Sequence, residues 1–184
     1  MMKRTAYVQA FSQSKQIAFC ALFAALCAVG TIVLVVPMPY GYFNAGDIFV
    51  LLSGWCLGPV FGAISAGVGS ALADIWSGYA VYAPATFFIK ALDALVAYFV
   101  WRALKKAFKS NRELPRLLSA FTGECVMAFG YFAFECILYG FAGAAVALPA
   151  NVLQGVFGTV LATLLVALLC KNKSAQKLFP LLHE

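Results

Sequence analysis

Long apolar runs, separated by short segments rich in glycine, proline and polar residues, dominate the pattern along the chain. A helix needs about 20 mostly apolar residues to cross a bilayer. Divided at the turn signals, the runs predict six helices, at residues 15–36, 42–57, 60–76, 84–104, 117–141 and 149–170. The second run is short and is interrupted by Asn44, Gly46 and Asp47, so by itself it fits a tilted crossing or a re-entrant loop.

The positions of the basic residues decide between these two interpretations. Twelve of the thirteen lysines and arginines form three clusters, before the first run, between the fourth and fifth, and after the sixth. They are Lys3, Arg4 and Lys15; Arg102, Lys105, Lys106, Lys109, Arg112 and Arg116; and Lys171, Lys173 and Lys177. If all clusters share the cytoplasmic side, an even number of crossings separates each pair, so the second run has to cross. The pattern predicts an all-α bundle of six transmembrane helices, one domain over residues 1–184, with both termini in the cytoplasm.

Composition supports an integral protein of the cell membrane. Of the residues, 64% are hydrophobic and only 11% are charged, and the mean hydropathy is +0.90. A soluble domain of 184 residues could not bury so much apolar surface. The net charge of +6 is explained by topology and by contact with anionic lipid, so no nucleic-acid partner is needed. The first apolar run is longer than the core of a signal peptide, and we expect it to remain as a helix.

Few residues in this sequence could support catalytic, metal or cofactor chemistry. The six cysteines lie in apolar stretches without a C-x-x-C spacing, and the one histidine, His183, is next to the last residue. No Walker A sequence occurs, so this chain does not use ATP by that route. We expect no catalytic residue, no metal site and no cofactor.

Small residues repeat at helical spacing in the first apolar run. Ala21 and Ala25 lie four residues apart, and so do Ala24 and Ala28. Stripes of this kind let two helices approach closely in lipid. Spacing alone leaves open whether the neighbouring helix belongs to this chain or to a partner.

Six ionisable residues fall within the predicted helices or at their edges: Asp47, Asp74, Lys90, Asp93, Glu124 and Glu135. Facing lipid would be costly, so we expect these side chains to face the interior of the bundle. Lys90 and Asp93, at positions i and i+3, can neutralise each other. This pair is either a structural ion pair or part of a polar binding site.

Polar and aromatic residues gather at the predicted external end. Lys90 lies about two turns below that surface, and Glu135, Asn151 and Gln154 lie near the outer ends of the last two helices. The outer connections are rich in tyrosine, phenylalanine, glycine and proline and have no basic residue. Some of these aromatic residues belong to the interfacial belt. The others suit stacking on a flat heterocycle, with the connections as a lid.

The stretch from Gly46 to Ala97 resembles the substrate-binding S components of energy-coupling-factor (ECF) vitamin transporters. The similarity is carried by "GD" at 46–47, "GP" at 58–59, Asp74, "GY" at 78–79, "YAP" at 82–84, Thr86, and Lys90 with Asp93. It is greatest for the hydroxymethylpyrimidine, pyridoxine and riboflavin-like subgroup. The helix count and the alanine pairs extend it over most of the chain, whereas the last two helices match only in general character.

The resemblance implies a binding subunit for a water-soluble vitamin, with pyridoxine or hydroxymethylpyrimidine preferred and riboflavin next. The expected substrate-binding residues are Asn44, Asp47, Tyr79, Tyr82, Thr86, Lys90, Asp93, Glu135, Asn151 and Gln154. The paired Lys90 and Asp93 would form the polar floor of the site. Many relatives have glutamate where this chain has Asp93, so the acidic role carries over and a particular ligand contact does not.

The resemblance also implies partners. The alanine pairs, Ala21 with Ala25 and Ala24 with Ala28, would contact a transmembrane coupling (T) subunit. Two ATPase subunits would supply the ATP hydrolysis.

Two other classes of function remain alternatives. In a membrane enzyme, Glu124 and Asp93 could act as acid and base. In an autonomous channel or ion-coupled carrier, the same buried acids would line the path of the ion.

Overall fold

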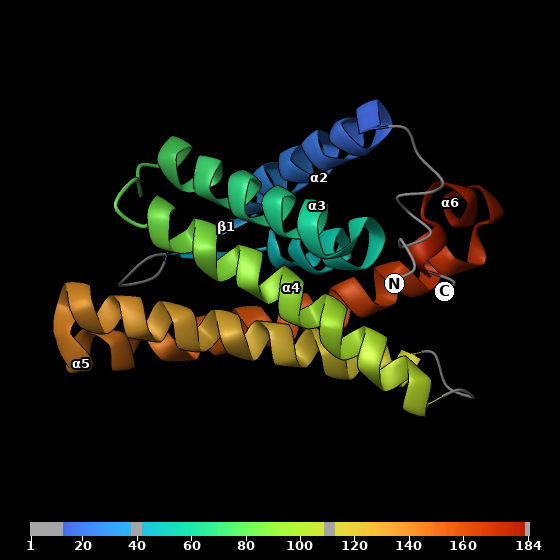
Figure 1. Ribbon diagram of the computed structural model, residues 1–184. Coiled ribbons are helices and arrows are strands. Elements are labelled where there is room, and N and C mark those ends of the chain that lie inside the picture. Colours follow the sequence, from blue (N-terminus) through green and yellow to red (C-terminus); the bar gives the residue numbers. More distant parts are fainter. Residues whose placement is uncertain (1–12, 38–41, 109–112, 183–184) are drawn as a thin grey trace, which may run out of the picture.

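The computed structural model describes residues 13–37, 42–108 and 113–182 (Figure 1). Its helices are α2 (Gln13–Val33), α3 (Asp47–Trp76), α4 (Ala83–Ala107), α5 (Glu113–Lys171), α6 (Lys173–Leu178) and the 3₁₀ turn η1 (Pro180–Leu182). Two short strands, β1 (Val35–Pro37) and β2 (Tyr42–Asn44), pair antiparallel between α2 and α3. His183 and the predicted basic residues Lys3, Arg4, Lys109 and Arg112 lie outside the described residues.

The prediction of an all-helical membrane protein is confirmed for the described part of the chain, apart from the strand pair. Helices α2, α3, α4 and α5 are each long and apolar enough to cross a membrane. The strands were not predicted, and they replace helix at both ends of the connection. Helix α2 ends at Val33, before Pro37, and residues 42–44, expected to be helical, form β2. A helix usually ends before a proline, and strand pairing then satisfies the exposed backbone groups.

Helix α3 is divided at Gly58. This glycine has φ 81° and ψ −174°, a conformation open almost only to glycine, and Pro59 follows it. The Ser53 hydroxyl donates to the Gly62 carbonyl over 3.0 Å, so two residues nine apart are neighbours. The chain therefore turns back on itself at Gly58 (Figure 1).

Helix α5 is divided at Gly140 in the same way, with φ 73° and ψ 173°. The parts before and after this glycine lie side by side, because a Cβ atom on Gly155 or Gly158 would touch Glu124. Residues 142–148 were predicted to connect the fifth and sixth helices, and this is wrong, because they are helical. The alanines in this stretch favour helix, and a helix is the simplest way to satisfy the backbone in apolar surroundings.

Helix length does not decide the number of crossings. Residues 47–57 of α3 would span only about 16 Å as a helix, roughly half the thickness of the hydrocarbon layer. The count of six crossings therefore stays a prediction.

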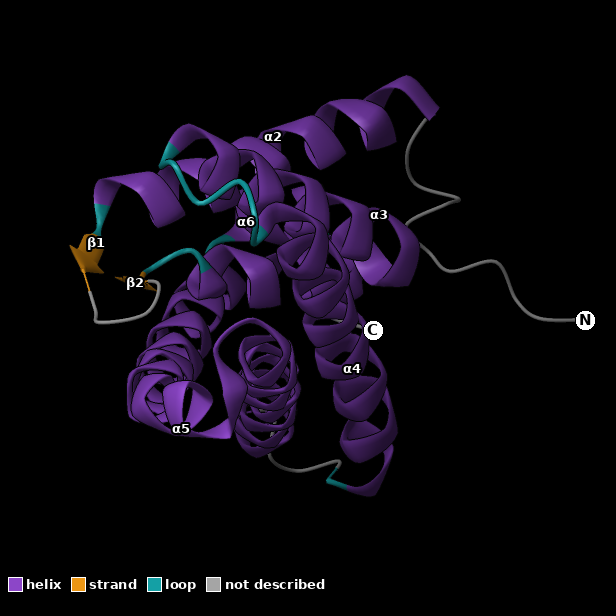
Figure 2. Cartoon of the chain, turned by 90° about the vertical axis from the view of Figure 1, so that its left-hand side faces the viewer, coloured by secondary structure: helices purple, strands orange, loops and turns teal. Residues whose placement is uncertain are grey.

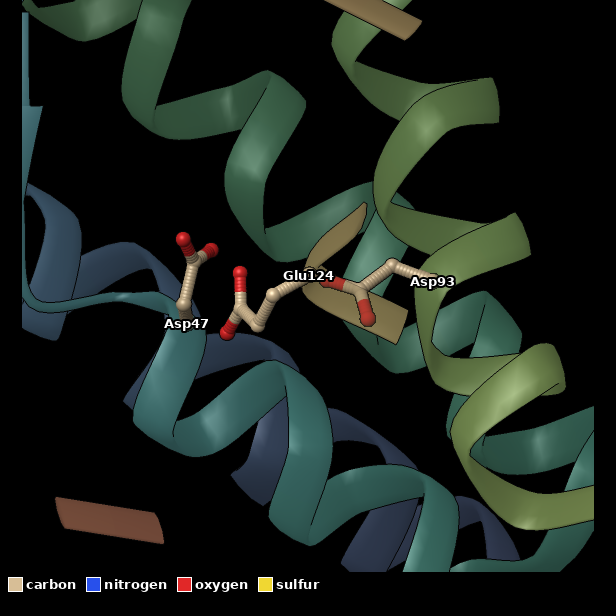
Figure 3. Close-up of side chains that lie close together, drawn as sticks. All are labelled: Asp47, Asp93 and Glu124. Atoms are coloured by element: carbon tan, nitrogen blue, oxygen red, sulfur yellow. The ribbon is translucent and has the colours of Figure 1, made fainter. Parts of the chain in front are cut away.

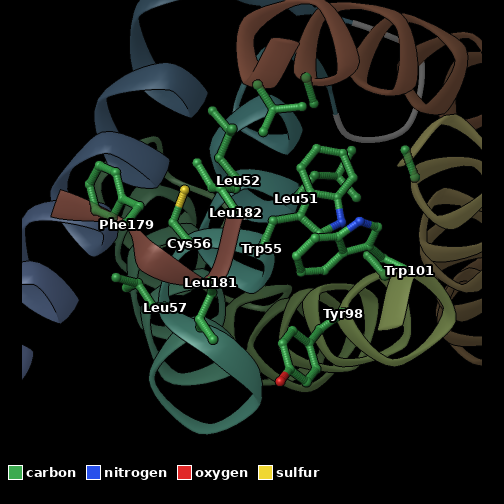
Figure 4. Close-up of a cluster of buried hydrophobic side chains, with 14 of the residues drawn as sticks. Leu51, Leu52, Trp55, Cys56, Leu57, Tyr98, Trp101, Phe179, Leu181 and Leu182 are labelled. Carbon is green, nitrogen blue, oxygen red and sulfur yellow. The ribbon is translucent and has the colours of Figure 1, made fainter. Parts of the chain in front are cut away.

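The bundle has two chemically different ends. The start of α2, the end of α4, and α6 lie together at one end, and the strands and the α3–α4 connection lie at the other (Figure 1). At the first end, Trp55, Trp101 and Leu181 belong to a large buried apolar cluster (Figure 4). Buried Arg116 donates to the Leu182 carbonyl over 3.0 Å and fastens the C-terminal turn there. Figure 2 looks onto the opposite end, which carries the strands.

Candidate functional site

A cavity lies at the end of the bundle that carries the strands. It is bounded by β2, the end of α3, the α3–α4 connection, the start of α4 and both parts of α5. The lining residues are Tyr42, Asn44, Asp74, Tyr79, Tyr82, Thr86, Tyr131, Glu135, Asn151 and Gln154. The empty space among them, including the part open to solvent, is about 380 Å³.

The structure brings most of the predicted site residues together around this cavity. Those that line it are Asn44, Tyr79, Tyr82, Thr86, Glu135, Asn151 and Gln154. Asp47, Lys90 and Asp93 are buried and do not line it. Tyr42, Asp74 and Tyr131 were missing from the predicted set. For Tyr131 the sequence held a signal, because it precedes Glu135 by four residues and so shares its helical face.

Aromatic rings form one wall of the cavity. The ring centroids of Tyr42 and Tyr79 are 4.8 Å apart, and those of Tyr79 and Tyr82 are 6.3 Å apart. Tyr82 also packs edge-on against Phe134 at 5.4 Å. The hydroxyls of Thr86 and Tyr131 are hydrogen-bonded over 3.0 Å. The wall combines flat apolar faces with hydroxyl groups, which suits a polar heterocycle.

Tyr42 and Asp74 connect β2 to the end of α3. The Tyr42 hydroxyl donates a hydrogen bond to Asp74 Oδ1. Burial raises the pKa of the Tyr42 hydroxyl well above its ordinary value, and the negative charge of Asp74 adds to the rise. Tyr42 therefore stays protonated at physiological pH, and its proton is committed to Asp74.

Amide groups connect the cavity to the residues beneath it. The backbone N–H and the side-chain amide of Asn44 donate to Gln154 Oε1 over 2.9 and 3.2 Å. Gln154 Nε2 in turn donates to Asp47 Oδ2 over 2.7 Å. Gln154 thus lies between the lining residue Asn44 and the buried carboxylate Asp47.

The buried ammonium group of Lys90 forms its ion pair with Asp47. The predicted pairing with Asp93 is wrong: neither Asp93 oxygen has a hydrogen-bond partner among the described residues. Helical side chains lean toward the N-terminus of their helix, so the long Lys90 side chain extends away from Asp93. The Lys90 ammonium group reaches Asp47 at the start of α3. It also lies 5.4 Å from the ring centre of Tyr131.

Residues 11–171 match the family model described as ECF-type riboflavin transporter, S component. The chain belongs to this family. The fold matches a solved structure of the S component of a bacterial ECF transporter, with a TM-score of 0.70 over 87% of this chain and 98% of that chain. At 22% identity this match shows the fold alone. A Pyrococcus woesei protein, described as an uncharacterized protein in the gap 3′ region, is 34% identical over 136 residues, or 72% of this chain and 86% of the relative.

Family membership confirms the predicted resemblance in its broad form. The chain is an S component, a membrane-embedded substrate-binding subunit of an ECF vitamin transporter, and its family is one of transporters and not a class of enzymes. The helices of this S component are of the membrane type, in agreement with that family.

Three carboxyl groups gather beneath the cavity of the S component. Asp47, Asp93 and Glu124 come from α3, α4 and α5, and one oxygen of each lies within 4.8 Å of the others (Figure 3). All three are buried, and the Glu124 oxygens have no hydrogen-bond partner among the described residues. Carboxylate oxygens are ligands for hard cations, so the expectation of no metal site stays untested.

The two alanine pairs of the S component lie in different surroundings. Ala24 and Ala28 are partly buried, and a Cβ atom on Gly69 of α3 would touch the Ala24 backbone. Ala21 and Ala25 are exposed. One pair thus lies on the side of α2 that packs within the bundle, and the other is free for contact outside it.

Proposed function

We propose that this S component binds an unmodified vitamin or vitamin precursor in the tyrosine-lined cavity, with pyridoxine or hydroxymethylpyrimidine preferred and riboflavin next. The observation that supports this most is the convergence of six chain segments on one partly open space. Four tyrosines offer faces for stacking, and Thr86, Asn151 and Glu135 offer hydrogen-bonding groups. Hydroxyls and ring nitrogens of these vitamins match such groups.

In this proposal the cavity opens to the outside of the cell. The basic residues Lys15, Lys105 and Lys173 lie on elements at the opposite end of the bundle (Figure 1). The positive-inside rule places such an end in the cytoplasm. Six crossings, made by α2, the two parts of α3, α4 and the two parts of α5, then leave both termini inside, with residues 1–184 as one domain.

Asp47, Lys90 and Asp93 form the layer below the ligand. Lys90 lies behind Tyr131, which lines the cavity, and Asp47 holds Gln154. The Lys90 ion pair thereby orients two lining side chains. In this proposal the Lys90–Asp47 pair takes the place of the predicted Lys90–Asp93 pair as the floor of the site. Asp93 keeps a supporting acidic role.

The proposed partners are a transmembrane coupling subunit and two ATPase subunits, with the lipid bilayer around the assembly. The exposed pair Ala21 and Ala25 is the surface of α2 that suits a partner helix. Ala24 and Ala28 are partly buried and contribute less to that surface.

The test is to identify what co-purifies with the detergent-solubilised protein. The protein is denatured, and its supernatant is analysed by mass spectrometry; a vitamin panel is then titrated against the emptied protein by calorimetry. We expect one vitamin or precursor at near-equimolar amount. An empty protein that binds no member of the panel would overturn the proposal. Ion-driven uptake by liposomes that contain this chain alone would favour the carrier alternative.

A further inference from the structure

The ionisable groups that line the cavity are all acidic or phenolic. Asp74 and Glu135 are carboxylates, and the described residues that line the cavity include no lysine, arginine or histidine. The nearby cation Lys90 lies beneath the cavity and is paired with Asp47. Asp93 and Glu124 add two further carboxyl groups in the same layer. A ligand in the cavity therefore meets surroundings with an excess of acidic groups.

The hydrogen-bond donors near the ligand are largely committed to these carboxylates. Tyr42 donates to Asp74, Asn151 donates to Glu135 over 3.4 Å, and Gln154 donates to Asp47 over 2.7 Å. An anionic group on a ligand would have to compete with a carboxylate for each of these protons. In exchange it would meet no cationic side chain among the lining residues that the structure describes.

The carboxylate oxygens, in contrast, can accept further hydrogen bonds. Asp74 is 4% exposed, and its Oδ2 atom has no hydrogen-bond partner within the geometric limits among the described residues, although Thr86 lies close enough to interact with the carboxylate. Each carboxylate oxygen can accept about two hydrogen bonds. Burying such an oxygen without a partner is costly, so a ligand N–H or O–H group at this point would be stabilising.

We propose that the cavity selects an unphosphorylated ligand that presents hydrogen-bond donors or a protonated nitrogen, and that Asp74 and Glu135 are the residues that impose this selection. The inference rests on the proposed function and adds the charge class of the ligand. A phosphate ester carries about −1.5 to −2 charges at pH 7. Like charges placed together cost several kcal/mol, which corresponds to about 100-fold or more in affinity.

The test compares each vitamin with its own phosphate ester. Pyridoxine with pyridoxine 5′-phosphate, hydroxymethylpyrimidine with its phosphate, and riboflavin with its 5′-phosphate are titrated against the purified full chain. We expect the parent compound of one pair to bind and its ester to bind about 100-fold more weakly or worse. Asp74→Asn and Glu135→Gln keep the shape of the side chain and remove the charge. Each should reduce that ratio by about tenfold, whereas the exposed control Glu113→Gln should leave it unchanged.

The outcomes separate this inference from the function on which it rests. If a parent vitamin binds and its ester binds equally well, the selection by charge is wrong and the proposed function stands. The same holds if the ratio persists in both variants, since size and not charge would then exclude the ester. If no member of any pair binds, the proposed function itself is overturned. Should Asp74→Asn not fold, Glu135→Gln and the wild-type ratio still decide the matter.

Discussion

At the scale of single residues, the buried charge of Lys90 depends on one long-range partner. The side chains of Lys90 and Asp47 are 3% and 1% exposed, and 43 residues separate them in the chain. Asp47 also accepts a hydrogen bond from Gln154. Such a pair adds little net stability when intact, but loss of one member leaves a buried charge without a counter-ion.

Replacing one member of this pair should therefore destabilise the protein more than replacing both. We expect Asp47→Asn or Lys90→Met to lower the free energy of unfolding by about 3 kcal/mol. The double variant Asp47→Asn/Lys90→Met should lose clearly less than the sum of the two. Thermal unfolding in detergent measures this, with exposed Lys173→Met as the control. Additive losses would contradict the pairing.

At the scale of elements, two glycines and two faces of α2 organise the bundle. Gly58 and Gly140 have backbone conformations that only glycine adopts readily, and each turns a long apolar helix back on itself. Helix α2 packs against α3 near Ala24 and leaves Ala21 and Ala25 exposed. Because the two alanine pairs lie in different surroundings, substitutions can test each pair separately.

Larger side chains on the exposed pair should weaken assembly without affecting the vitamin site. Overpacking of a close helix contact costs about 1–3 kcal/mol, so Ala21→Leu/Ala25→Leu should reduce recovery of the coupling subunit in co-purification by about tenfold. Vitamin affinity of the isolated subunit should stay unchanged. The control Ala145→Leu places the same side chain at an exposed position of α5 and should assemble normally. Normal assembly of the double variant would remove this face from the interface.

At the scale of the whole molecule, a basic end lies opposite an acidic, tyrosine-rich end, and this contrast is the basis of the proposed orientation. If the basic end stays in the cytoplasm, as the positive-inside rule predicts, the cavity opens to the outside, where a vitamin would be captured. The large apolar cluster and the C-terminal turn close the opposite end. In the proposed orientation, we expect release of a vitamin into the cell to require a larger rearrangement than binding does.

Cysteine labelling in intact cells tests this orientation. In a background without the six native cysteines, Val81→Cys in the α3–α4 connection should react with a membrane-impermeant maleimide. Lys173→Cys on α6 should react only after the cells are permeabilised. Val81 is 59% exposed and Lys173 is also exposed, so reactivity reports sidedness and not burial. The reverse pattern would refute the proposed topology.

The sequence by itself determined the membrane class, the apolar helices and the chemical contrast between the two ends. These features depend on composition, on run length and on the positions of charges along the chain, which are local or additive properties. It also indicated most lining residues. Gln154 was indicated by its depth along a predicted helix, and Tyr82 by the resemblance to a known family.

Only the tertiary structure decided which side chains meet. Lys90 pairs with Asp47 and not with its helical neighbour Asp93, because side-chain direction and helix packing outweigh spacing in the sequence. Residues 142–148 are helical where a connection was expected, since one glycine, Gly140, is enough to reverse the chain. Tyr42, Asp74 and Tyr131 join the cavity from three separate elements, and the distance between such elements is a property of the packed bundle that no single stretch of sequence encodes.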